Sequence, residues 1–96
     1  MEIKDEYRRK LESLLKEWKS TIDQLEERAR KLTARAKIEL LETIEILKLK
    51  RDSVQTRLDD MRNAGDEVWE GLKKSAEKAV TEMKTAMENT KSKFKH

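Results

Sequence analysis

The chain has 96 residues, of which 35% are hydrophobic and 45% are charged, so it can form at most one small domain with a thin core. Its 23 basic and 20 acidic residues are interleaved, which is typical of solvated helix surfaces and not of a nucleic-acid-binding arm. There is no cysteine for disulfide or thiolate chemistry, and no apolar run approaches the roughly 20 residues that a membrane-spanning helix needs. The N-terminus lacks the apolar stretch of a signal peptide, and we expect a cytoplasmic protein.

Apolar or small residues recur every three or four positions from Tyr7 to Phe94, with Arg51 as the one charged member, as one face of an α-helix requires. With no proline and only two glycines, this periodicity indicates helix and argues against disorder. The mean step is near 3.6 residues, between the heptad and 11-residue repeats, which predicts long helices with weak supercoiling. In the first half, the stripe consists of Tyr7, Leu11, Leu14, Trp18, Ile22, Leu25, Ala29, Leu32, Ala36, Leu40, Ile44 and Leu47.

One clear stop signal interrupts the stripe, at Asn63-Ala64-Gly65-Asp66. Gly65 suits the left-handed position that ends a helix, and Asp66 suits the N-cap of the next. The sequence therefore predicts a first helix over about residues 3–63, a turn over about 64–66 and a second helix over about 66–94, within one domain spanning 1–96. Two alternatives stay open. Gly65 could lie inside one continuous helix, or a further break near 31–37 could give a three-helix bundle, although that segment has no glycine or proline.

The unequal lengths of these two helices predict self-association. At 1.5 Å per residue the first helix is about 90 Å long and the second about 42 Å, so a hairpin covers only the later half of the first. The uncovered apolar stripe would then be an interface between copies. Its residues are Tyr7, Leu11, Leu14, Trp18, Ile22, Leu25 and Leu32. Ile38, Ile46 and Leu49 project from another side of the helix, which indicates a further neighbour.

The expected fold is therefore all-α, a hairpin of a long and a short helix that assembles as an oligomeric coiled coil or helical bundle, with a dimer or tetramer as the main form. We expect no enzymatic activity, metal or cofactor. The chain has a single histidine, no Glu-x-x-His pair and no base placed to activate a nucleophile. The function that fits is a structural or protein-interaction coiled coil, with its own copies as the main partner and other helical proteins as further ones.

Two other functions are weighed against this one. The second helix, with Trp69 beside its apolar face, could bind a lipid or granule surface as an amphipathic helix. Residues 28–37 hold five basic residues and no acid, and Arg28, Lys31 and Arg35 share a helix face that could contact phosphates. Pairing with acids of a neighbouring helix, or simple exposure to water, explains these charges better, so nucleic acid is the less favoured partner.

Three segments together carry a family resemblance: Glu6-Tyr7-Arg8-Arg9-Lys10-Leu11-Glu12 with Trp18, Ala36-Lys37-Ile38-Glu39, and Ala64-Gly65-Asp66-Glu67-Val68-Trp69-Glu70-Gly71-Leu72-Lys73. In this order they resemble small bacterial coiled-coil proteins of about this length that carry no assigned activity. The resemblance covers most of the chain. It implies a bacterial, cytosolic coiled coil and transfers no functional residue.

Overall fold

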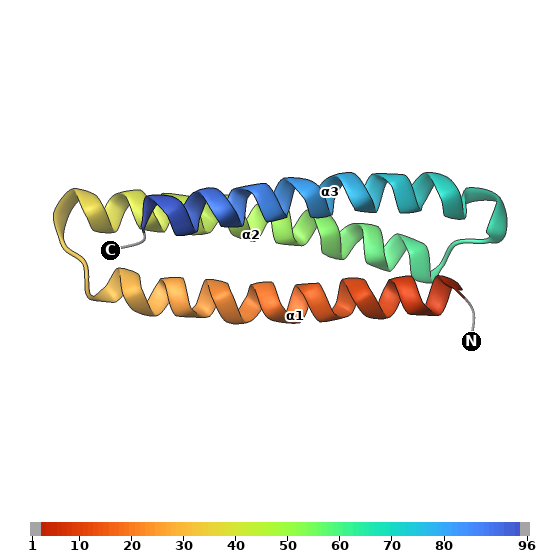
Figure 1. Ribbon diagram of the computed structural model, residues 1–96, viewed down its shortest axis with the longest axis horizontal. Coiled ribbons are helices and arrows are strands. Elements are labelled where there is room, and N and C mark those ends of the chain that lie inside the picture. The colour runs from red at the N-terminus through yellow and green to blue at the C-terminus, as the bar shows by residue number, and fades with distance from the viewer. Residues whose placement is uncertain (1–2, 95–96) are drawn as a thin grey trace.

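The structure is a computed structural model that describes residues 3–94, and three α-helices account for nearly all of them. They are α1 (Ile3–Arg30), α2 (Ala34–Arg62) and α3 (Asp66–Lys93). The helices run up, down and up along a rod that measures 51 × 20 × 19 Å (Figure 1). The prediction of an all-helical chain is confirmed.

The prediction of one long helix over residues 3–63 is wrong, because the chain breaks at residues 31–33 and forms three helices of similar length. A continuous helix would keep a few more backbone hydrogen bonds but would leave Leu11, Trp18 and Ile22 in water. Burying each of these side chains contributes about 1.5–3 kcal/mol, whereas local helix propensity is worth only tenths of a kcal/mol per residue. Tertiary burial therefore decides the break, although no glycine or proline marks it.

The first connection is short and tightly bonded. The backbone N–H groups of Lys31 and Leu32 donate to the carbonyls of Arg28 and Ala29, both at 3.1 Å, which tightens the last turn of α1. Thr33 is extended (φ −130°, ψ 162°), and its side chain forms no capping hydrogen bond. Ala34 then takes φ 52°, the one positive φ of a non-glycine residue in the described chain. The connection thus carries local backbone strain at Ala34.

Replacing Ala34 with glycine should stabilise the fold by about 0.5–1 kcal/mol, because glycine adopts positive φ without a Cβ clash and this gain exceeds its larger entropy cost. Urea unfolding followed by circular dichroism measures the change. Ala36→Gly in the same helix is the matched control and should destabilise the fold instead. Equal destabilisation by both substitutions would show that Ala34 carries no strain.

The second connection lies where the sequence predicts it, between Arg62 and Asp66. Gly65 is not left-handed, however. It is extended (φ −82°, ψ 172°) and precedes α3 at the N-cap position, while Asn63 caps α2. Asp66 is the first residue of α3, and its carboxylate forms an ion pair with Lys4 at the start of α1. The predicted turn is confirmed, but the predicted roles of Gly65 and Asp66 are wrong.

The core runs the length of the rod, with α2 as the central helix that approaches both α1 and α3 closely. The predicted stripe supplies nearly all of it. The buried apolar side chains are Leu11, Leu15, Trp18, Ile22, Ala29, Leu40, Ile44, Leu47, Val54, Leu58, Met61, Trp69, Ala76, Ala79, Met83 and Met87. The buried Thr90 hydroxyl donates to the Ala86 carbonyl at 2.8 Å, so this polar group is satisfied.

Candidate interaction surfaces

The helix α2 is apolar on two opposite sides. Its inner side, with Leu40 and Leu47, is buried between α1 and α3. Since successive residues of a helix turn by about 100°, Ile38 and Leu49 lie within about 20° of each other and directly opposite Leu47. Four large apolar side chains are exposed on this outer side: Ile38 (59%), Leu41 (43%), Ile46 (52%) and Leu49 (70%). We call these four residues the outer face of α2.

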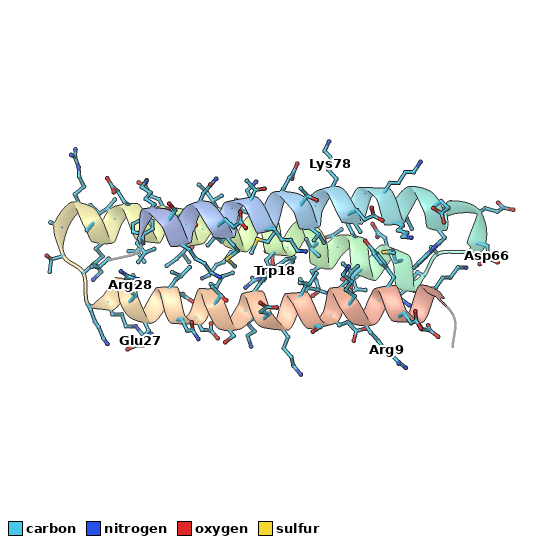
Figure 2. The ribbon with its side chains drawn as sticks, in the orientation of Figure 1. Arg9, Trp18, Glu27, Arg28, Asp66 and Lys78 are labelled. Carbon is cyan, nitrogen blue, oxygen red and sulfur yellow. The ribbon has the colours of Figure 1, made fainter. Side chains whose placement is uncertain are left out.

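The structure places most of the predicted interface inside the chain's own core. Leu11, Trp18 and Ile22 are buried among α2 and α3, and Figure 2 shows Trp18 pointing into the bundle. Partly buried side chains from the same prediction pack against that core, namely Tyr7, Leu14, Leu25 and Leu32. The expected bare stripe on the first helix does not exist, because the chain turns back at residues 31–33 and α2 packs closely along α1.

The other part of the predicted interface does lie on the surface. Ile38, Ile46 and Leu49 are exposed, as their position off the main stripe indicates. Leu41, which completes the outer face one turn after Ile38, was not predicted as part of the interface. Its i+3 spacing from Ile38 could have identified it, because this spacing places two residues side by side on a helix.

A second feature is an open groove of about 430 Å³ between α1 and α3. Leu11, Leu14 and Val80 form its apolar part, and Lys10, Lys73 and Glu77 line its polar part together with Tyr7 and Thr81. Burial, and then the negative charge of Glu77, raises the pKa of the Tyr7 hydroxyl above its usual value of 10.0. Tyr7 therefore stays protonated near neutral pH and is no base for catalysis.

The aromatic rings at this end of the groove form a packed cluster. The Tyr7 ring meets the Trp69 ring edge to face, with centroids 6.2 Å apart and an interplanar angle of 84°. The Lys4 ammonium lies 5.5 Å from the centre of the Trp69 ring, and the Lys73 ammonium lies 5.6 Å from that of Tyr7. These contacts join the first turns of α1 and α3 and account for both lysines structurally.

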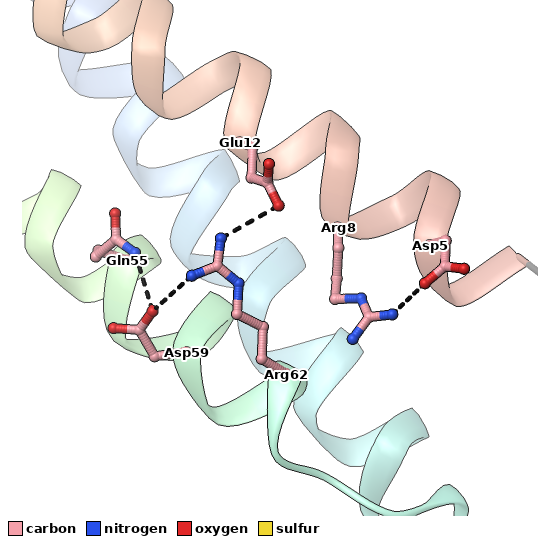
Figure 3. Close-up of polar contacts among 6 residues, drawn as sticks. All are labelled: Asp5, Arg8, Glu12, Gln55, Asp59 and Arg62. Carbon is pink, nitrogen blue, oxygen red and sulfur yellow. Dashed lines mark hydrogen bonds and ion pairs between the residues drawn. The ribbon is translucent and has the colours of Figure 1, made fainter.

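Arg62 joins α1 to α2 at the same end of the rod (Figure 3). Its guanidinium contacts Glu12 of α1 at 3.2 Å and Asp59 of α2 at 3.5 Å, and Gln55 donates to Asp59 at 3.0 Å. Arg8 forms an ion pair with Asp5 nearby. The network links α1 to α2 and pairs these charges with one another.

The break at residues 31–33 changes the predicted anion contact. Arg28 lies in the last turn of α1, Lys31 in the connection and Arg35 in the first turn of α2. They do not share one helix face, as a continuous helix would require. The fold gathers them instead at one end of the bundle, where Figure 2 shows Arg28.

Among residues 3–94, no group of three or more His, Asp or Glu side chains is placed to hold a metal ion. None of the three helices over these residues has the long apolar run that crossing a membrane requires. In comparisons with known proteins, no family model, no curated protein and no solved structure matches the chain.

Proposed function

We propose that this protein is a non-catalytic helical bundle that acts through self-association, with the outer face of α2 as the contact surface. One observation carries the proposal. Four of the five exposed large hydrophobic side chains in the described chain lie on this side of α2, and the fifth, Val68, lies on α3. Ile38 with Leu41 and Ile46 with Leu49 form two apolar pairs on either side of Glu42 and Glu45. Several exposed apolar side chains on one side of a helix mark an interaction site, whereas single ones are common.

The spacing of the four residues favours a second copy as the occupant. The four residues are placed symmetrically along the helix axis about the midpoint between Thr43 and Ile44. Leu41 and Ile46 lie at equal distances on either side of this midpoint, and so do Ile38 and Leu49. An antiparallel copy of α2 therefore places Ile38 at the level of Leu49 and Leu41 at the level of Ile46. Two-fold dimers need such a self-complementary patch, because each copy contributes the same surface.

The charges beside the outer face support the same arrangement. Glu39 and Lys50 lie on one flank of α2. In an antiparallel pair, the separation along the helix axis between Glu39 of one copy and Lys50 of the other is only about 3 Å. On the opposite flank, Lys48 is neutralised by Glu26 of α1 at 3.2 Å. Glu42 and Glu45 lie near the centre of the face and repel their copies, so we expect a weak dimer that forms as concentration rises.

Substituting Ile38 and Leu49 with aspartate should abolish dimerisation without unfolding the bundle, because both side chains are exposed in the single chain. Sedimentation over about 10 µM to 1 mM measures the mass of parent and variant. The parent should approach the dimer mass, while the variant should stay a monomer with the parent's circular dichroism. Val68→Asp on α3 is the matched control and should dimerise like the parent. A parent that is monomeric throughout this range would contradict the proposal.

The orientation of the two copies has its own test. Lys50→Glu should weaken the dimer by placing two acids together, and Glu39→Lys in the same chain should restore it by exchanging the charges. A parallel pair brings Glu39 near the opposite flank of the partner helix, so the double variant would not recover there.

The alternative of lipid- or granule-surface binding by residues 66–94 has less support. Trp69, Met83 and Met87 of α3 are buried in the core. Contact with a lipid surface through this face would require the bundle to open and lose that burial. Other helical proteins stay possible partners of the outer face of α2.

A further inference from the structure

The two ends of the rod differ in how their charges are arranged. One end holds the last turn of α1, the connection 31–33 and the first turn of α2 (Figure 1). Residues 28–37 lie there and contain Arg28, Arg30, Lys31, Arg35 and Lys37 with no acidic residue. We call these five residues the basic end.

Basic side chains at the opposite end are neutralised by acidic neighbours. Lys4 pairs with Asp66, Arg8 with Asp5, and Arg62 with both Glu12 and Asp59 (Figure 3). At the basic end, Arg30 pairs with Glu27 of the preceding turn at 2.8 Å. Arg28, Lys31, Arg35 and Lys37 take part in none of the ion pairs found among residues 3–94. Lys31, Arg35 and Lys37 are exposed and Arg28 is partly exposed, so of the two simpler explanations, pairing with a neighbouring helix and exposure to water, the structure shows the second.

Helix stability explains only part of this clustering. Basic residues in the last turn of α1 and acidic residues in the first turns of α1 and α3 are favourable for the helix dipoles. The start of α2 has the opposite arrangement, with no acid in its first turn and with Arg35 and Lys37 near its positive end. These two residues are unfavourable for their own helix, so the local charge favours an external anion.

We propose that the basic end binds the phosphate backbone of a double-stranded nucleic acid. Arg28 and Arg35 supply planar guanidinium groups that can contact a phosphate with two hydrogen bonds each, and Lys31 and Lys37 add two further positive charges. Phosphate contacts of this kind carry non-specific affinity. The segment 28–37 has no aromatic side chain on which single-strand bases could stack. Residues 28–37 expose no large apolar side chain that could enter a lipid interface, which favours nucleic acid over lipid.

Fluorescence anisotropy with a labelled duplex of about 25 base pairs tests the proposal on the full chain. If three or four phosphates are contacted, affinity should fall about 40- to 150-fold between 50 and 200 mM salt. Lys31→Glu with Arg35→Glu should reduce affinity at least about tenfold at 50 mM salt by removing two contacts. The matched control, Lys74→Glu with Lys78→Glu, makes the same change in net charge on exposed positions of α3, and Lys78 points away from the bundle in Figure 2. This control variant should lose much less affinity for the duplex.

Three results would overturn the proposal: no duplex binding at 50 mM salt, equal losses in the two double variants, or binding to phosphatidylserine vesicles without binding to the duplex. Circular dichroism of both variants shows that the fold is kept. The outcome is independent of the outer face of α2, because the dimer-breaking variant of Ile38 and Leu49 retains the whole basic end.

Discussion

Substituting Ile22 with aspartate is expected to unfold the chain at every protein concentration. Ile22 is 1% exposed in the middle of α1, and the fold offers no cation inside the core to pair with a carboxylate there. Burying an unpaired charge costs several kcal/mol, which is comparable to the whole stability of a small domain. Circular dichroism at two concentrations about a hundredfold apart measures the loss of helix.

The matched control for this variant is Ile46→Asp, the same substitution on α2 at a side chain that is 52% exposed. It should keep the helical signal and a melting temperature close to that of the parent. The long-helix oligomer makes a different prediction: the parent's melting temperature would rise with concentration, and Ile22→Asp would disrupt assembly. Observing both of those results would refute the three-helix bundle as the folded unit.

Truncating Leu47 to alanine is expected to destabilise the bundle by about 2–5 kcal/mol, because it removes a fully buried side chain and leaves a cavity between the three helices. The control is two residues away. Leu49 is 70% exposed on the same helix, and Leu49→Ala should change stability by no more than about 0.5 kcal/mol. Urea unfolding below the concentration at which the dimer forms isolates the effect within one chain. Equal effects of the two substitutions would mean that α2 is rotated relative to the described core.

The apolar periodicity was enough to predict that the chain is helical and which side of α2 faces the core. Leu40, Ile44 and Leu47 belong to the predicted stripe and are all buried. Ile38, Ile46 and Leu49 were predicted to point elsewhere, and they do. Periodicity reports the direction of a side chain on its own helix, and that is a local property.

The break at residues 31–33 could not be found in this way, because the residues around it are good helix formers and the gain from folding back is non-local. A clue lay in the length argument itself. A long helix left Leu11, Trp18 and Ile22 exposed, and the chain could bury them either against other copies or by folding back on itself. The prediction favoured other copies, whereas in the fold α2 packs along α1 and these side chains join the chain's own core.

Charge patterning was the least predictable feature. Arg28, Lys31 and Arg35 were assigned to one helix face, but the break distributes them over two helices and a connection. The partner of a surface charge depends on which helices meet, and this information is absent from the spacing along one helix. The pairing of Arg62 with Glu12, 50 positions away, was missed for the same reason.

An odd number of antiparallel helices has a mechanical consequence. The start of α1 lies at one end of the 51 Å rod, and α3 ends toward the other (Figure 1). A load applied between these two points acts along the helix axes. It therefore shears the buried apolar contacts between neighbouring helices over their whole length, instead of separating a hairpin from one end. Joined in series with other segments, such a unit transmits tension along its length and keeps the adjoining segments a fixed distance apart.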